Sequence, residues 1–182
     1  MERLLVFGLL SIPLLILSWR TLFNFTSHGF YRFFSWECIL WLFITNQEFW
    51  FHNPLSIKQI FSWMLLFLSV YLVIAGSLSL KNASKSVYPR NDKTLFQFEK
   101  TTELVDSGIY KYIRHPLYAS LLYLTWGIFL KNTSLPLFIV ALLSSVLLFL
   151  TALADEKECI RFFGTEYLEY MKRSQRFIPF VL

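Results

Sequence analysis

The apolar residues of this chain gather in long blocks, and this pattern limits the folds available to it more than any other feature. The blocks lie at residues 4–23, 33–51, 60–80, 117–130 and 135–154. A helix of about 20 apolar residues crosses the hydrocarbon core of a bilayer. The fourth block is shorter, and the polar run Lys131–Ser134 before Pro136 predicts a tight helical hairpin between blocks four and five. The sequence therefore predicts an all-α integral membrane protein with about five transmembrane helices.

The overall composition also indicates a membrane protein. Hydrophobic residues make up 55% of the 182 residues and charged residues 16%, which is less charge than soluble domains usually carry. No small-residue cleavage site occurs before Trp19 and Arg20, so we expect the first block to be a retained span rather than a signal peptide. Cys38 and Cys159 are far apart and lack a metal-ligand spacing. We predict two buried, inert thiols, without a disulfide framework or a metal site.

Basic residues are unequally distributed between the loops. With five spans, all 17 Lys and Arg residues except Arg3, Lys58 and Lys131 fall on one side of the membrane. Because Lys and Arg in short loops stay preferentially in the cytoplasm, we expect the N-terminus outside and the loop 81–115 and the tail 155–182 in the cytoplasm. The net charge of +5 suits anionic lipid headgroups, and we expect no nucleic-acid partner. For most of these charges, topology alone is a sufficient explanation.

Several polar side chains interrupt the second apolar block. They are Glu37, Asn46, Gln47, Glu48 and His52. An ionisable group within a span can mark a functional site, but we expect these residues near the ends of the span, at the membrane interface.

The segment Val105–Tyr118, directly before the fourth block, combines several local signals. It contains a turn sequence ending at Gly108, and Pro116 suits the first turn of a helix. Arg114 and His115 would then lie at a helix N-terminus, which favours anions. An alternative interpretation is an interfacial belt in which the tyrosines of this segment anchor at headgroup depth. That alternative does not explain why a turn, an Arg-His pair and a Pro-started helix coincide.

An acidic cluster, residues 155–158, follows the fifth block. Acidic residues are unfavourable at a helix C-terminus, so we expect the helix to continue into the cytoplasm. Ile160, Phe163, Tyr167 and Tyr170 would then form one apolar stripe at helical spacing. Such a stripe more often packs against lipid or a neighbouring helix than binds a ligand. An acidic cluster within reach of the Arg-His pair would make a polar pocket beside the bilayer.

The order of these motifs resembles the isoprenylcysteine carboxyl methyltransferase family and its bacterial relatives, which are also similar to phospholipid methyltransferases. The shared pattern is GIYKYIRHPLY, a helical hairpin, an acidic pair, FFGTEYLEY and a closing FIP. It covers residues 102–179, less than half of the chain. Residues 1–80 are therefore expected to form three N-terminal spans, and residues 81–182 the catalytic region.

The resemblance implies methyl transfer from S-adenosylmethionine to a lipid-like or isoprenoid-like membrane substrate, in a cytoplasmic pocket closed by C-terminal helices. It implies Arg114, near the point of transfer, and Glu156 as catalytic residues. By position, the cofactor site would comprise Thr102, Glu103, Leu104, Val105, Tyr110, His115, Pro116, Leu117, Tyr118, Asp155 and Glu156. The sequence contains no GxGxxG motif, so a Rossmann-type cofactor site is not expected.

Two positions depart from the family pattern. Relatives that methylate prenylcysteine carry an Arg where this chain has Thr151, and a Glu is usual at Asp155. The first departure argues against a prenylcysteine carboxylate as substrate, because a guanidinium is its natural partner. Two other function classes stay open. A sterol-type NADPH reductase shares an RHP motif but usually continues with Asn and Gly-Asp, where this chain has Leu117 and Ala119-Ser120, and a non-catalytic membrane scaffold would need no cofactor pocket.

Overall fold

The computed structural model describes residues 1–83 and 103–179. These residues form α1 (Glu2–Ser18), α2 (His28–Asn46), α3 (Ile57–Ala83), α4 (Pro116–Phe129), α5 (Leu135–Phe163) and α6 (Thr165–Arg173), with short 3-10 helices η1 (Gln47–Phe49) and η2 (Gly108–Lys111). Within these two ranges, the only extended pairing is a bridge between Ile113 and Gln175. The expected all-α architecture is confirmed for this part of the chain. Thr102, which was expected in the cofactor site, lies outside the described residues.

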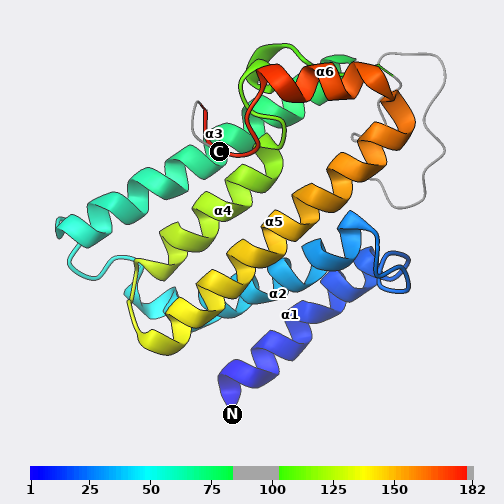
Figure 1. Cartoon of the computed structure of the whole chain (residues 1–182). Helices are drawn as coiled ribbons and strands as arrows, with labels where there is room; N and C mark the ends of the chain where they lie inside the picture. Colours follow the sequence, from blue (N-terminus) through cyan, green and yellow to red (C-terminus); the bar gives the residue numbers. More distant parts are fainter. Residues whose placement is uncertain (84–102, 180–182) are drawn as a thin grey trace.

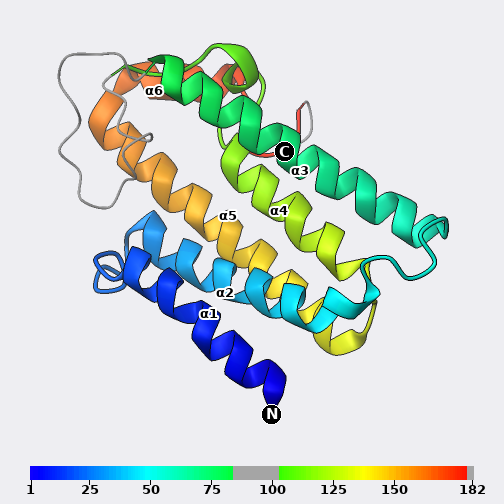
Figure 2. The same ribbon diagram turned by 180° about the vertical axis from the view of Figure 1, so that it is seen from behind.

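The helix α5 is central to the arrangement (Figures 1 and 2). It packs against α2 on one side and α4 on the other, while α3 covers α4 and α1 covers α2. The helix α6 crosses one end of the bundle, close to η2, the start of α4 and the end of α5. This end therefore collects both segments that carry the sequence motifs.

The five apolar blocks correspond to α1 to α5, with shifted boundaries. The helix α2 begins at His28, ahead of its apolar block, because the Ser27 side chain caps it by accepting from the Gly29 N–H. The helix α5 continues through the acidic cluster, as expected, and ends at Gly164, whose φ of 61° suits glycine. The predicted single stripe is therefore wrong in one respect: its last two members, Tyr167 and Tyr170, lie on a separate helix, α6.

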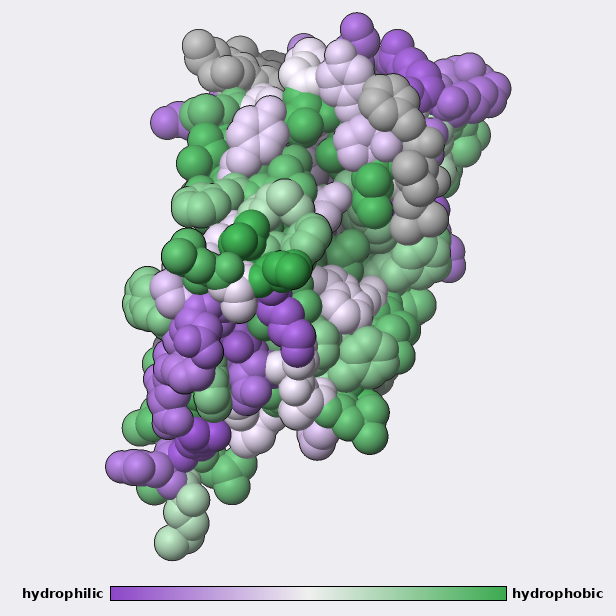
Figure 3. All heavy atoms as spheres, turned by 90° about the vertical axis from the view of Figure 1, so that its left-hand side faces the viewer, coloured by the Kyte–Doolittle hydropathy of each residue, from purple (hydrophilic) through white to green (hydrophobic). Residues whose placement is uncertain are grey.

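The apolar surface is that of a membrane protein. Two segments, Ile57–Lys81 and Leu135–Phe163, are long and apolar enough to cross a bilayer, and α4 is apolar but shorter. Large apolar side chains such as Leu9, Phe67 and Leu142 are exposed along α1, α3 and α5. In Figure 3, apolar side chains cover the upper middle and the right-hand side of the face, and hydrophilic ones gather at the top right and in a patch at the lower left. Such a surface suits lipid better than water. The five-span topology and its orientation stay predictions.

Small polar side chains connect the helices inside the bundle. The Ser144 hydroxyl of α5 lies 3.0 Å from Ser35 Oγ of α2 and 3.2 Å from Thr125 Oγ1 of α4. The side chain of Asn46 on α2 donates to the Ile128 carbonyl of α4 at 2.9 Å. Hydrogen bonds between small polar residues are typical of helices that pack within a membrane.

Glu37 lies in the middle of α2, not near one of its ends as expected. Its Oε2 accepts a hydrogen bond of 2.6 Å from Ser11 Oγ of α1. The position of Glu37 thus has a packing explanation, because a polar contact between two otherwise apolar helices fixes their relative register.

Candidate active site

The segment before α4 has the local structure that its sequence predicts. Gly108 starts η2 with a φ of 62°, a value that glycine adopts without strain. Pro116 is the first residue of α4, and His115 precedes it as the N-cap residue. Arg114 and His115 therefore lie at the end of the bundle where α6 crosses it.

The residues after α6 hold this segment in place. The N–H groups of Arg114 and His115 donate to the carbonyls of Gln175 and Arg176 at 2.7 and 3.2 Å, and Gln175 N–H donates to Tyr112 O at 3.0 Å. From α6 itself, the Tyr170 hydroxyl donates to the Tyr110 carbonyl at 2.6 Å. Residues separated by some 60 positions in sequence thus form one rigid unit.

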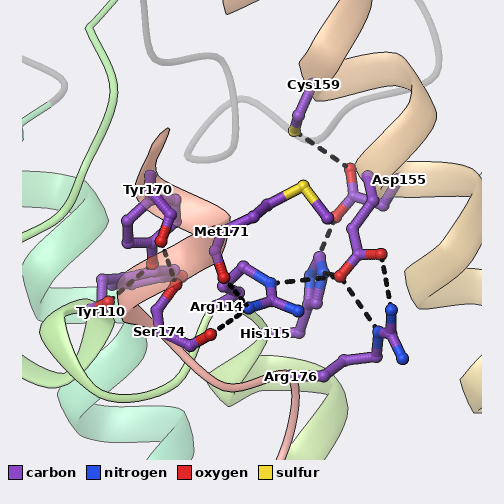
Figure 4. A network of polar contacts seen from close by, with 10 residues as sticks. Tyr110, Arg114, His115, Asp155, Cys159, Tyr170, Met171, Ser174 and Arg176 are labelled. Atoms are coloured by element: carbon purple, nitrogen blue, oxygen red, sulfur yellow. Dashed lines mark hydrogen bonds and ion pairs between the residues drawn. The ribbon is translucent and has the colours of Figure 1, made fainter. Parts of the chain in front are cut away.

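Glu156 of α5 is the centre of a buried charge network, and Figure 4 shows Arg114, His115 and Arg176 converging on it from the surrounding segments. The Oε1 atom of Glu156 accepts from Arg114 Nε at 3.1 Å and from Arg176 Nε at 3.0 Å, and its Oε2 accepts from Arg176 Nη2 at 2.9 Å. Arg114 Nη1 also donates to the carbonyls of Met171 and Ser174. The Glu156 side chain is 5% exposed and that of Arg114 8%. Burial of this network requires that each charge keep its partners.

His115 lies between the two acids of α5. Its Nδ1 is 3.4 Å from Asp155 Oδ2, and its Nε2 is 3.4 Å from Glu156 Oε1. Burial alone would lower the pKa of His115, but the two carboxylates outweigh it and raise that pKa above its ordinary value. Among the described residues, Nε2 has no aligned hydrogen-bond acceptor. The imidazole ring stacks on Tyr118, with 5.4 Å between the ring centroids.

A cavity opens beside these charges. Its space, open mouth included, is about 720 Å³. It is lined by Leu80, Leu104, Val105, Tyr110, Arg114, His115, Leu117, Tyr118, Asp155, Cys159, Phe163, Tyr167 and Tyr170. Burial raises the pKa values of Tyr167 and Tyr170 well above their ordinary range, so both keep their hydroxyl protons. The cavity combines a charged end with a mainly aromatic and aliphatic wall.

Most of the predicted site residues come together at this cavity, but some do not line it. Glu103 is exposed, and Pro116 is buried against the α3 position Gly76. Glu156 lies behind the cavity wall, in the charge network. These three are not among the lining residues.

The sequence reasoning also missed several residues at the site. Phe163, Tyr167 and Tyr170 were interpreted as a packing stripe, yet they line the cavity. Cys159 was expected to be buried and inert, but it is half-buried and borders the same cavity. The spacing of the stripe relative to Asp155 was the signal that could have found them. Arg176 had no such signal, because its position depends on the turn at Gly164.

His28, at the start of α2, reaches the acidic cluster from the side of α5 away from the cavity. Its Nδ1 lies 2.8 Å from Glu158 Oε2, its N–H donates to Glu158 Oε1 at 3.2 Å, and its side chain is 0% exposed. Burial alone would lower the pKa of His28, but the bond to Glu158 and the charge of Asp155 raise it. No sequence motif pointed to His28.

The ligand-type atoms of His28, Asp155 and Glu158 all lie within 4.8 Å of one another, a spacing that a metal ion could also use. The positive charge of Arg32 acts on both His28 and Asp155, and this disfavours a further cation between them. We therefore interpret the group as a charge network that joins α2 to α5.

Comparisons with known proteins show which family the chain resembles. Residues 57–166 match the family model described as phospholipid methyltransferase. The chain is 34% identical over 132 residues to the human protein-S-isoprenylcysteine O-methyltransferase and 31% identical over 132 residues to the Xenopus laevis protein of that name. Each match covers 69% of this chain but 44% of the relative, so the chain spans less than half of these curated relatives. No solved structure gives a significant match.

The matched region extends from the start of α3 to the start of α6, and it includes Arg114, His115, Asp155 and Glu156. The helices α1 and α2, and with them His28, lie outside it. The resemblance predicted from the motifs is confirmed, and the chain belongs to the phospholipid methyltransferase family.

Proposed function

We propose that this protein transfers a methyl group from S-adenosylmethionine to a lipid-like or isoprenoid-like membrane substrate at the cavity beside Arg114. The observation that carries the proposal is the cavity itself, which joins a buried charged end to an aromatic wall and is lined mostly by residues of the region that matches a methyltransferase family. A reductase of the sterol type has no comparable support, because the family match is to methyltransferases.

The residues around the cavity fit the chemical groups of S-adenosylmethionine, which supplies a methyl group on an electrophilic sulfonium. Asp155 suits an ammonium, while Arg114 suits a carboxylate. Aromatic rings, among them Tyr118 and Phe163, suit an adenine ring and a sulfonium cation. The cofactor-holding residues would be Leu104, Val105, Tyr110, His115, Leu117, Tyr118 and Asp155, with Thr102, Glu103 and Pro116 placed there by the resemblance alone.

Arg114 and Glu156 have different roles in this proposal. Arg114 borders the cavity and presents a fixed positive charge to it, so we assign it as the catalytic residue nearest the point of transfer. Glu156 does not border the cavity and acts through Arg114, Arg176 and His115. It is therefore a positioning residue. Methyl transfer mainly requires alignment and the exclusion of water, which a rigid network and an apolar wall provide.

The acceptor is proposed to enter sideways from the bilayer beside α4. An apolar tail that stays in lipid anchors the substrate at about 0.8 kcal/mol per methylene, so only a small polar head needs to reach the cavity. Thr151 is fully buried and its hydroxyl donates to the Leu147 carbonyl at 2.8 Å, where prenylcysteine-methylating relatives are expected to carry Arg. We therefore expect an amphipathic lipid to be a better acceptor than a farnesyl-cysteine.

The experiment is methyl transfer by the protein in nanodiscs, with labelled S-adenosylmethionine. Three acceptors are compared: native lipid extract, a farnesyl-cysteine analogue and a soluble short-chain acceptor. We expect label in the lipid fraction. Faster labelling of the farnesyl-cysteine analogue would contradict the substrate argument, and label only on the soluble acceptor would contradict entry from the membrane. Failure to bind S-adenosylmethionine at all would favour a scaffold, and oxidation of NADPH a reductase.

A further inference from the structure

A second cleft lies on the opposite face of α5 from the candidate active site. Its residues on α5 are Leu150, Leu153, Ala154, Lys157, Glu158 and Arg161. At 3.6 residues per turn, Leu150, Leu153, Lys157 and Arg161 face away from Asp155. Glu158 lies at the edge of this face, with its carboxylate within 4.8 Å of that of Asp155. The opposite wall consists of Asn24, Thr26 and Ser27 of the α1–α2 loop and Tyr31 of α2. The cleft has about 1070 Å³ of space, open mouth included.

The α5 wall of this cleft changes in character along the helix. Leu150, Leu153 and Ala154 form its apolar part, and Lys157 and Arg161 its basic part. The two basic side chains are exposed and stand one helical turn apart on the same face, close enough for both to contact one phosphate. An apolar part followed by a pair of cations matches the order of tail and headgroup in a membrane lipid.

The cleft is positively charged despite the presence of Glu158. Both carboxylate oxygens of Glu158 are engaged by His28, one by its backbone N–H at 3.2 Å and one by Nδ1 at 2.8 Å. This acid is therefore directed toward α2 and its charge is offset there. Lys157 and Arg161 are the cationic side chains that line the cleft, and they set the sign of its field.

We propose that this cleft binds an anionic phospholipid, with its phosphate between Lys157 and Arg161 and an acyl chain along Leu150 and Leu153. The amide of Asn24 and the hydroxyl of Tyr31 offer further donors at the rim. The site is distinct from the cofactor cavity and does not depend on the proposed methyl transfer. An anionic lipid there would join the α1–α2 loop to the end of α5.

The test is native mass spectrometry of the purified chain with phosphatidylglycerol or phosphatidylcholine. We expect tighter binding of phosphatidylglycerol by about tenfold, since each basic residue adds to the attraction of an anionic headgroup. The double substitution Lys157→Gln and Arg161→Gln should abolish this preference. The control, Lys111→Gln with Lys172→Gln, removes the same charge from exposed positions outside the cleft and should keep it.

Two further measurements separate a lipid from its headgroup alone. Glycerol phosphate, which has the charge but no acyl chain, should bind at least tenfold more weakly than phosphatidylglycerol. Leu153→Trp, which fills the apolar part, should weaken lipid binding and leave glycerol phosphate binding unchanged. Equal affinity for the two lipids, or equal loss in the cleft and control double variants, would overturn the proposal. If glycerol phosphate bound as tightly as phosphatidylglycerol, the cleft would be a phosphate site and the lipid proposal would be overturned.

Discussion

Buried cations occur at both ends of the α4–α5 pair, and their surroundings differ. At the end crossed by α6, Arg114 faces Glu156 at 3.1 Å and borders a cavity. At the hairpin end, Lys131 is 5% exposed, donates to Gln59 Oε1 at 2.9 Å and lies 3.6 Å from the Trp63 ring centroid. An amide and aromatic rings surround Lys131, whereas Arg114 pairs with a carboxylate.

This difference separates a structural cation from a functional one. Lys131 is surrounded by the Trp50 and Trp63 rings, so its burial stabilises the packing of the hairpin through cation–π contact. Arg114 pairs with Glu156, and His115 lies between Asp155 and Glu156. Arg114, His115 and Asp155 all border an open cavity. Burial of a charge is therefore a poor indicator of function, and opposite charges that converge on a cavity are a better one.

The largest effect is expected from Glu156→Gln. Loss of this carboxylate leaves Arg114 and Arg176 without their shared partner, so we expect a loss of about 3 kcal/mol in the free energy of unfolding and about a 100-fold slower methyl transfer from misplacement of the site. Thermal melting and initial rates measure the two. The matched change at the other end, Gln59→Met, should leave the transfer rate unchanged. A Glu156→Gln rate near that of wild type would contradict the assignment of the network.

The next test separates two neighbours within the site. Arg114→Lys keeps the charge but loses the planar fork, so we expect kcat to fall by about tenfold or more with little change in donor affinity. His115→Gln should instead raise the Kd for S-adenosylmethionine by about tenfold, because His115 lines the cavity and lies 3.4 Å from Asp155, the acid proposed to hold the ammonium of the donor. Single-turnover kinetics and equilibrium binding distinguish the two. The reverse pattern would exchange the roles that we assign to them.

A smaller, pH-dependent effect is expected at His28. Because its folded-state pKa is raised above 6.5, its ion pair contributes fully to stability below about pH 6.5, and this contribution is lost as pH rises through the folded-state pKa. His28→Asn keeps a donor toward Glu158 but cannot titrate. The melting temperature of wild type should exceed that of the variant at pH 6, and the gap should narrow toward pH 9. A difference in melting temperature that stays constant or widens as pH rises would contradict the interpretation that His28 is protonated in its pair with Glu158.

The smallest effect on methyl transfer is expected at the hairpin end. Lys131→Met keeps most of the side-chain length but loses the cation–π contact with Trp63 and leaves Gln59 Oε1 without its donor. We expect a loss of about 1–2 kcal/mol in the free energy of unfolding and no change in the transfer rate. If Lys131→Met lost as much activity as Arg114→Lys, the distinction between a structural Lys131 and a functional Arg114 would be wrong.

Local sequence signals predicted the parts of the fold that depend on local rules. Pro116 predicted the start of α4, and the apolar blocks predicted α1 to α5. Helical periodicity also contained information that was not used: Asp155 and Glu156 are about 100° apart around α5, so only one of them could face the cavity. Gly164 was likewise a recognisable helix terminator.

Other parts of the site depend on contacts between distant segments. Arg176 reaches Glu156 only because the chain reverses at Gly164 and returns along Arg114 and His115. His28 reaches Glu158 across 130 positions, from a helix outside the family match. Neither contact has a local sequence signature, because both depend on how helices pack against one another.

The central claim is that the cavity beside Arg114 binds S-adenosylmethionine, and the two cysteines of the chain allow a direct test. Cys159 lines the cavity, whereas Cys38 lies in α2 and is not among the lining residues. The measurement is the rate at which a small thiol reagent modifies Cys159 in the Cys38→Ala protein, and Cys38 in the Cys159→Ala protein, as S-adenosylmethionine is titrated. We predict that the donor slows modification of Cys159 in a saturable way and leaves Cys38 unaffected. An unchanged rate at Cys159 while labelled donor is bound, or equal slowing at both cysteines, would contradict the location of the site.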